Sequence, residues 1–346
     1  MKNFINSAVL IVDNKIILRH CLNYLHKYNF KKIILLKQKK FQIKKDLIKN
    51  FNIKIINFSS QNFTYDILKK KIYKMDIENR FLLFRTSKFI NLNLFELYKI
   101  FIRNNKKLVI TISKKNKELN NTEFFFVKKN MINKYDFTFK NISKNSNYKL
   151  HFVNNEYLKL KKNQNEKKID QFFSKIYSRS IILDRDGVIN VNKGYVGFKK
   201  DFIFQPGAIK AIKYLNKNNV NIFVVSNQSG IARGYFTLTD VEKLHNYLRG
   251  HLIKNSAVIN KIYYSPYHVD GILKKYSKNS SCRKPGIKLF KNIIKEWSIK
   301  NKSNMIMIGD QLTDMQFAEK AQIKSSLFSG GNLYNFIKKL DLNVKS

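Results

Sequence analysis

Two aspartates separated by one residue follow a short apolar run near the middle of the 346-residue chain. Asp184 and Asp186 come after Ile-Ile-Leu at 181–183 and before Gly187, which predicts a buried strand that delivers both carboxylates into a turn. In open α/β sheets the reacting groups lie just beyond the carboxyl ends of the strands, so this position suits chemistry. The pattern alone is not specific, because Asp-x-Asp-Gly also suits calcium loops and ordinary turns.

A second buried strand is predicted over residues 220–225, and it ends in Ser-Asn-Gln-Ser-Gly at 226–230. The hydroxyl of Ser226 and the turn after it can donate hydrogen bonds to a phosphoryl oxygen, or they form an ordinary polar turn. Ile-Ala-Arg-Gly follows at 231–234, so Arg233 is offered to a second anionic group.

A third short strand is predicted over residues 305–308, before Gly309 and Asp310. Asp310 would join the first two carboxylates around a hard cation, which prefers oxygen ligands. Asp314, one helical turn later, either orients a neighbouring group or is a first-turn acid favoured by the helix dipole.

Two cations precede a predicted helix over residues 287–297. Arg283 and Lys284 stand before Pro285 and Gly286, where a lysine can neutralise a phosphate together with an attacking carboxylate. The alternative is a solvated basic turn, although arginine is scarce in this chain.

These four elements, in this order, resemble the haloacid dehalogenase (HAD) superfamily of phosphatases. Further stretches, at 192–196, 226–234 and 282–285, resemble its heptose 1,7-bisphosphate phosphatases, and the likeness covers about residues 178–330. The resemblance implies an α/β fold. The spacing of 42 residues from Asp184 to Ser226 and of 58 from Ser226 to Lys284 leaves little room for a separate cap domain. The resemblance also implies Mg²⁺ as cofactor and an aspartyl-phosphate intermediate.

The roles implied by this family fall on the following residues of the chain. The catalytic set is Asp184 as nucleophile, Asp186 as general acid and base, Ser226 and Lys284; the metal set is Asp184, the backbone carbonyl of Asp186, and Asp310. The substrate set is Asn192, Lys193, Gly194, Tyr195, Asn227, Gln228, Ser229, Arg233, Arg283 and Gln311.

The sequence differs from the family's pattern in the zinc-binding loop. Its four ligand positions are here Ser265, Tyr267, Ser280 and Cys282, so one ligand of four remains. His268 lies one position off the pattern and does not complete a tetrahedral site. No zinc is expected.

Glycine and proline divide the chain: all twelve glycines and all three prolines lie between Gly187 and Gly331. In the first half, strands are predicted over 7–12, 31–36, 53–58, 81–84 and 107–112, and helices over 16–28, 63–74 and 92–102. Alternating strands and helices predict a parallel α/β sheet.

The first half resembles the sugar-phosphate nucleotidyltransferase family over residues 5–155, through the apolar runs at 8–10, 17–25 and 30–36. That family's glycine-rich nucleotide loop is missing after Leu10, and its metal-binding Gly-Asp is replaced by Arg85 and Thr86. Loops that cradle phosphates need glycine, so we expect a degenerate domain retained for folding, assembly or regulation.

Composition limits the remaining possibilities. The formal charge of +44 invites a nucleic-acid interpretation, but 58 lysines stand against nine arginines and are spread along the whole chain. No specific nucleic acid is expected. The chain has no apolar run long enough for a membrane span, its N-terminus is unlike a signal peptide, and its two cysteines, Cys21 and Cys282, suit a reducing compartment; we expect a cytoplasmic protein.

The sequence therefore predicts two α/β domains, each with a Rossmann-like, mostly parallel sheet flanked by helices. The first, over residues 1–165, is nucleotidyltransferase-like; the second, over 178–346, is a HAD-like phosphatase without a large cap. The expected substrate is a small sugar phosphate, namely the 7-phosphate of D-glycero-D-manno-heptose 1,7-bisphosphate. Alternatives are a histidinol-phosphate or other small phosphomonoester phosphatase, and a non-catalytic binding or scaffold protein with unknown protein partners.

Overall fold

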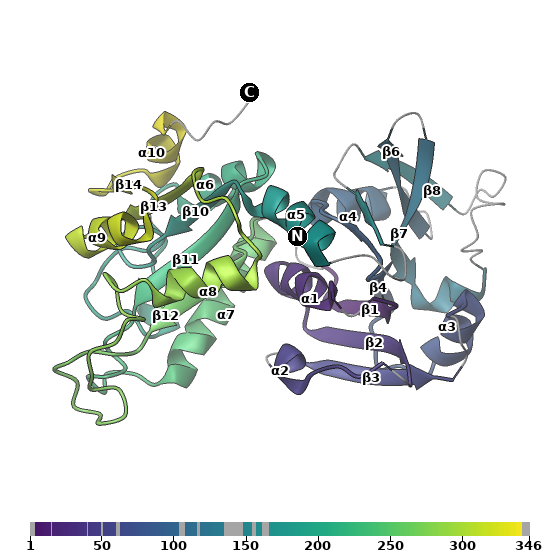
Figure 1. The fold of residues 1–346 in the computed structure, drawn as a ribbon, viewed down its shortest axis with the longest axis horizontal. Helices are drawn as coiled ribbons and strands as arrows, with labels where there is room; N and C mark the ends of the chain where they lie inside the picture. Colours follow the sequence, from purple (N-terminus) through teal and green to yellow (C-terminus); the bar gives the residue numbers. More distant parts are fainter. Residues whose placement is uncertain are drawn as a thin grey trace. The chain divides into compact units, whose positions relative to one another are not determined.

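The chain forms two compact units, Lys2–Ile169 and Asp170–Ser346. A computed structural model describes residues 4–14, 16–39, 41–49, 51–59, 63–103, 108–115, 118–134, 148–153, 157–160 and 166–340. Figure 1 labels the helices and strands of both units. Among these residues, no helix is both long and apolar enough to cross a membrane.

The N-terminal unit contains a seven-stranded mixed sheet in the order β3-β2-β1-β4-β7-β6-β8. Its strands are β1 Ser7–Val12, β2 Lys32–Gln38, β3 Ile53–Phe58, β4 Arg80–Arg85, β6 Leu108–Lys115, β7 Glu118–Lys128 and β8 Tyr148–Val153. Its helices are α1 Leu18–Lys27, α2 Lys45–Ile48, α3 Tyr65–Ile72 and α4 Leu94–Arg103, with a 3-10 turn η1 at Lys129–Lys134. A separate antiparallel pair joins β5 Lys88–Ile90 to β9 Tyr157–Lys159.

The sheet of this unit is mostly parallel, as predicted, and β7 is its antiparallel strand. This strand runs antiparallel to both β4 and β6, and it was not predicted. Its residues 124–127 are fully buried, whereas the polar residues before them gave no strand pattern. Because β1 pairs in parallel with β2 and β4, the remaining part of the sheet keeps the predicted arrangement.

The C-terminal unit is built on a five-stranded, wholly parallel sheet in the order β12-β11-β10-β13-β14. The strands are β10 Ser180–Leu183, β11 Asn221–Asn227, β12 Lys261–Ser265, β13 Met305–Gly309 and β14 Lys324–Leu327. The helices are α5 Glu166–Tyr177, α6 Ala208–Lys217, α7 Leu238–Lys254, α8 Lys288–Glu296, α9 Leu312–Ala321 and α10 Leu333–Lys339, with a 3-10 turn η3 at Lys199–Asp201. The predicted α/β class with mostly parallel sheets is confirmed.

Alternate residues of this sheet enter two apolar layers. Ile181 and Leu183 belong to the core cluster that also contains residues of α6, α7 and α10. On another layer, the ring of Phe223 lies 5.1 Å from that of Trp297, at the end of α8. Side chains of a strand alternate between faces, so this burial on both faces explains why the central strands read as continuous apolar runs.

Helix α5 occupies the stretch between the two predicted domains, 1–165 and 178–346, and it was not predicted. Phe173 stacks on Tyr177, whose ring lies 4.9 Å from that of Trp297. The buried positions Ile169, Phe173 and Tyr177 are four residues apart and therefore lie on one face of the helix. The lysines around them make this apolar face hard to recognise in the sequence.

Candidate active site

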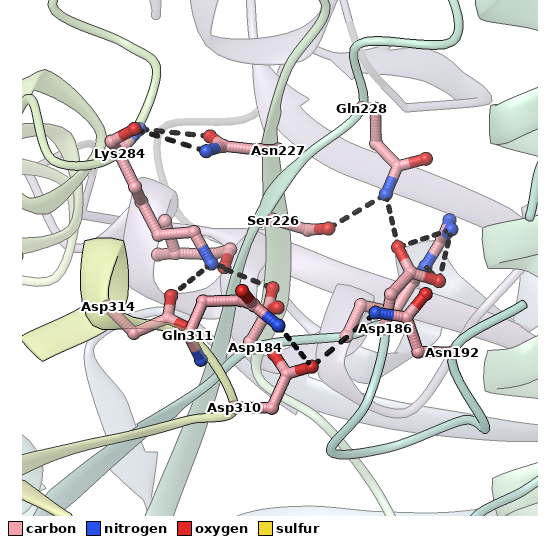
Figure 2. A network of polar contacts seen from close by, with 12 residues as sticks. Asp184, Asp186, Asn192, Ser226, Asn227, Gln228, Lys284, Asp310, Gln311 and Asp314 are labelled. Atoms are coloured by element: carbon pink, nitrogen blue, oxygen red, sulfur yellow. Dashed lines mark hydrogen bonds and ion pairs between the residues drawn. The ribbon is translucent and has the colours of Figure 1, made fainter. Parts of the chain in front are cut away.

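Three strand ends bring the predicted catalytic residues together. Asp184 directly follows β10, Ser226 is the penultimate residue of the neighbouring strand β11, and Asp310 directly follows β13. The Asp184 backbone N–H donates to the Ile308 carbonyl at 2.9 Å, which extends the pairing of β10 with β13 to the catalytic residue. Figure 2 shows these side chains pointing toward one another.

Lys284 is the buried cation of the site. Its ammonium Nζ lies 2.8 Å from Asp184 Oδ1 and 2.6 Å from Asp314 Oδ1, and it donates to the Val225 carbonyl at 2.9 Å. Burial by itself lowers the pKa of Lys284, but the two carboxylates outweigh burial and raise that pKa above its ordinary value. All three donors of the ammonium therefore have acceptors, and the lysine stays charged.

Asp184 is nearly as enclosed as the lysine. Burial raises the pKa of its carboxyl to about 7; Lys284 opposes this shift, while the neighbouring Asp314 and Asp186 add to it. A further cation beside this carboxyl would favour its ionised form, which is the form that a nucleophile requires.

The acidic cluster fits a hard divalent cation. Asp184, Asp310 and Asp314 can each present an oxygen within 4.8 Å of the others. Asp310 Oδ1 is buried and has no hydrogen-bond donor among the described residues, as expected of an oxygen that would coordinate a metal. Asp314 is already engaged, because its Oδ1 contacts Lys284 and its Oδ2 accepts from the Gln311 N–H at 3.1 Å.

The carboxylate of Asp186 is held by three residues. Arg185 Nη2 donates to both of its oxygens, at 2.9 and 2.8 Å. Asn190 Nδ2 donates to Oδ1 at 2.9 Å, and Gln228 Nε2 donates to Oδ2 at 2.8 Å. Gln228 Nε2 also donates to Ser226 Oγ at 2.8 Å, so the second strand end is tied to this carboxylate.

Several of the predicted substrate residues have partners within the protein. Asn227 pairs its amide with the backbone of Lys284, accepting from its N–H at 2.9 Å and donating to its carbonyl at 3.2 Å. Asn192 and Gln311 each donate to Asp310 Oδ2, at 3.5 and 3.1 Å. Asn227 thus holds the backbone of Lys284 in place, and Asn192 and Gln311 border the acidic cluster.

The remaining predicted substrate residues border a positively charged area beside the site. Burial and the neighbouring Arg233 hold the pKa of the Arg283 guanidinium below its usual value, and Nη1 of Arg283 is buried without a hydrogen-bond acceptor among the described residues. Arg233 Nη2 approaches the ring nitrogens of His268 at 3.4 and 3.5 Å. Other predicted contacts, in the turns after β10 and β11, are Lys193 and Gly194, both exposed, the half-exposed Tyr195 and the partly buried Ser229.

The former zinc positions make other contacts. Ser265 accepts the Gln228 N–H on its carbonyl at 2.7 Å, and Ser280 Oγ accepts from the Cys282 N–H at 3.3 Å. The ring of Tyr267 lies 6.1 Å from that of Tyr276. The absence of zinc stays a prediction that rests on these residue types.

Sequence comparisons identify the family. A sequence model described as HAD-hydrolase-like matches residues 281–334. The D-glycero-beta-D-manno-heptose-1,7-bisphosphate 7-phosphatase of Rhodopseudomonas palustris is 36% identical over 163 residues, which are 47% of this chain and 90% of the relative. The chain belongs to the family of these 7-phosphatases. It is a phosphomonoester hydrolase of the HAD type, as the sequence predicts.

Two solved structures are among those similar to parts of the chain. The D,D-heptose 1,7-bisphosphate phosphatase of B. bronchiseptica, complexed with magnesium and phosphate, is 27% identical and has a TM-score of 0.41, covering 47% of this chain and 87% of that one. The inositol-1-phosphate CTP transferase of T. maritima is 9% identical and has a TM-score of 0.39, covering 49% of this chain and 96% of that one. The family of the N-terminal unit stays a prediction.

Three residues of the site were not predicted, namely Arg185, Asn190 and His245. Arg185 is fully buried, and its Nη1 lies 3.3 Å from His245 Nε2. One signal was present, since Arg185 is one of only nine arginines and stands between the two aspartates. His245 lies 60 residues later in α7, and no spacing in the sequence indicates that it reaches Arg185.

Proposed function

We propose that this phosphatase depends on Mg²⁺ and removes the 7-phosphate of D-glycero-D-manno-heptose 1,7-bisphosphate through an aspartyl-phosphate. The observation that supports it best is the buried contact of Asp184 with Lys284 at one sheet edge, with Asp186 two residues further on. The substrate comes from the relatives, which are named for this sugar bisphosphate.

In the first step an Asp184 oxygen attacks phosphorus, and the bond between phosphorus and the sugar oxygen breaks. Asp186, in its protonated form, gives a proton to that departing oxygen. In the second step water attacks the phosphorus of the aspartyl-phosphate and loses a proton to Asp186. Inorganic phosphate leaves, and the Asp184 carboxylate is restored.

Lys284 and Ser226 act on the transferring group during both steps. The Lys284 ammonium beside Asp184 neutralises negative charge that would otherwise repel the nucleophile from the phosphate. Ser226 Oγ, which accepts from Gln228, keeps its own proton free to donate to a phosphoryl oxygen. Mg²⁺ held by Asp184, Asp310 and the Asp186 backbone carbonyl would supply the remaining positive charge.

The second phosphate of the substrate needs a cationic site of its own. Arg233 and Arg283 are suited to it, because the buried Nη1 of Arg283 lacks an acceptor and guanidinium groups match phosphate oxygens in pairs. The loop residues Asn192 to Tyr195 would contact the sugar between the two phosphates.

The test is a phosphate-release assay on both anomers of the heptose 1,7-bisphosphate, with histidinol phosphate as a comparison substrate. We expect turnover of a heptose bisphosphate in Mg²⁺, its loss in chelator and its recovery when Mg²⁺ alone is restored. Asp184→Asn should abolish turnover while leaving the melting temperature within a few degrees. Near-normal turnover by Asp184→Asn would exclude the mechanism, and a clear preference for histidinol phosphate would exclude the substrate.

Metal analysis of the same preparation tests the cofactor assignment. Because three of the four former zinc positions lack a thiol or imidazole, we expect no stoichiometric zinc. One zinc per chain, or activity that chelator removes and only zinc restores, would contradict the assignment.

A further inference from the structure

Arg185 is a fully buried cation in the middle of the catalytic Asp-x-Asp pair. Its Nη2 contacts both oxygens of Asp186 and also donates to the Val196 carbonyl. Because a buried guanidinium is costly unless its donors are used, these contacts fix its place firmly. The carboxylate that the reaction needs as acid and base is therefore tied to the interior of the domain.

The turn after β10 allows the contact between Arg185 and Asp186, which are neighbours in the sequence. The N–H groups of Ile189 and Asn190 both donate to the Arg185 carbonyl, at 2.8 and 3.0 Å. The Gly187 N–H donates to the Asn190 carbonyl at 2.7 Å, which folds the turn back on itself. In an extended strand the two side chains would point to opposite faces, whereas this turn lets the guanidinium reach the neighbouring carboxylate.

His245 completes the arrangement from α7. Its Nε2 lies 3.3 Å from Arg185 Nη1, and since a guanidinium has no acceptor, Nε2 must be the acceptor. Burial, with the neighbouring Arg185 and Arg249, holds the pKa of His245 well below its ordinary value, so the ring is neutral and can accept. Its ring also lies 5.2 Å from that of Tyr264, which limits its movement.

We propose that Arg185 and His245 are positioning residues that hold the Asp186 carboxyl in place for proton transfer to the leaving group. This inference rests on the proposed role of Asp186 as general acid. His245 orients the guanidinium of Arg185. The guanidinium, which lies in the interior of the domain, orients the Asp186 carboxyl. Protonation of Oδ2 for the first step leaves both of its donors with other acceptors, because Gln228 Nε2 keeps Ser226 Oγ, and Arg185 Nη2 keeps Asp186 Oδ1 and the Val196 carbonyl.

Leaving-group dependence separates positioning of the acid from simple stabilisation of the fold. A sugar alkoxide is a poor leaving group and needs the proton from Asp186, whereas p-nitrophenolate leaves without one. The value of kcat/KM reports only the steps up to formation of the aspartyl-phosphate. A misplaced acid therefore lowers kcat/KM for the sugar phosphate much more than for p-nitrophenyl phosphate.

The experiment compares His245→Phe, which has no acceptor, with His245→Gln, whose amide oxygen can accept from Arg185. We expect His245→Phe to lower kcat/KM for the heptose bisphosphate by about 10–100-fold and for p-nitrophenyl phosphate by less than about threefold. His245→Gln should recover most of the loss. The ratio of the two kcat/KM values is independent of the folded fraction, so a destabilised variant remains informative.

His251→Phe, in the same helix, is the matched control, because His251 packs against Phe204 and Tyr247 and away from Arg185. In His251→Phe the ratio of kcat/KM for the heptose bisphosphate to kcat/KM for p-nitrophenyl phosphate should equal that of the unaltered protein. Asp186→Asn should show the largest leaving-group effect, about 10²–10⁴-fold for the sugar phosphate. If Asp186→Asn shows no such effect, the proposed function fails; if Asp186→Asn shows it and His245→Phe lowers both substrates equally, only the positioning role fails.

Discussion

Lys284 is the residue on which both the chemistry and the local stability of the site depend. It is the shared partner of two buried carboxylates, Asp184 and Asp314, and its side chain is 2% exposed. Removing one partner of a buried ion pair leaves uncompensated charge, which is more costly than the pair was favourable. In the proposed mechanism the same ammonium neutralises the attacking carboxylate of Asp184.

We therefore expect Lys284→Met to lower the free energy of unfolding by about 3–5 kcal/mol and to remove measurable turnover. Denaturant titration and phosphate release measure the two effects. Lys288→Met is the control, because Lys288 is an exposed lysine at the start of α8 and should change neither quantity noticeably. A Lys284→Met protein that is as stable as its parent would show that the carboxylates do not depend on the lysine.

At this scale the sequence predicted which side chains lie together better than it predicted the residues that hold them. The structure brings Asp184, Asp310 and Lys284 together, and each was singled out by a local pattern, because it follows an apolar strand or precedes a helix. For Asp314 two roles were left open, and the structure shows both, since one oxygen contacts Lys284 and the other accepts from the Gln311 N–H. The contact of Arg185 with His245 spans 60 residues and depends on the packing of α7, which no local pattern encodes.

The turn after β10 is the element that sets the distance between the first aspartates and Asp310. Gly187 adopts φ +86°, and a Cβ atom there would lie 2.1 Å from Asp310 Oδ2. Both the backbone conformation and the close approach therefore require glycine. Asp310 can lie this close to the turn because residue 187 has no side chain.

Gly187→Ala should displace Asp310 and raise the Mg²⁺ concentration needed for half-maximal activity by about 10–100-fold. The strained backbone should also cost about 1–2 kcal/mol of stability. Gly250→Ala provides the contrast, since a Cβ at Gly250 meets nothing within 4 Å and the residue lies inside α7. That variant should gain about 0.5–1 kcal/mol and keep its Mg²⁺ dependence. Equal Mg²⁺ dependence of both variants would show that Gly187 does not set the position of Asp310.

Element prediction succeeded where an apolar run was continuous and failed where polarity hid the buried face. Strands β1 and β3 were predicted with the bounds that they have. Strand β7 was missed because its first half is rich in asparagine and lacks the apolar run or the alternation that marks a strand in the sequence. Helix α5 was missed because lysines and glutamate obscure a buried stripe four residues apart.

For the whole molecule, the uneven distribution of glycine corresponds to a difference between the two units at the carboxyl ends of their strands. In the C-terminal unit, glycines at 187 and 309 let acidic side chains approach the backbone at the strand ends. In the N-terminal unit, side chains fill the strand ends instead. Asp13, after β1, accepts from Thr86 Oγ1 at 3.0 Å, the Ser87 N–H at 2.8 Å and Arg85 Nη1 at 3.2 Å.

A second carboxylate, that of Glu123, pairs with the same arginine. Glu123 contacts Arg85 Nε at 2.7 Å, accepts from the Tyr65 hydroxyl at 2.8 Å and pairs with Lys88. The Arg85 guanidinium also lies over the Phe63 ring, 5.3 Å from its centroid. Asp13 and Glu123 are thus both paired with cations of the chain itself, which makes them poor ligands for a nucleotide's metal.

We accordingly expect the full-length protein to show no saturable binding of ATP, GTP or CTP by calorimetry in Mg²⁺, and no nucleotidyl transfer to a heptose 1-phosphate. Arg85→Met should leave phosphatase kinetics unchanged, because every proposed catalytic residue lies in the other unit. It should lower the stability of the N-terminal unit, since Asp13 and Glu123 would each lose a cationic partner. Micromolar affinity for any of these nucleotides, abolished by Asp13→Ala and unaffected by Asp184→Asn, would show that these strand ends bind a ligand after all.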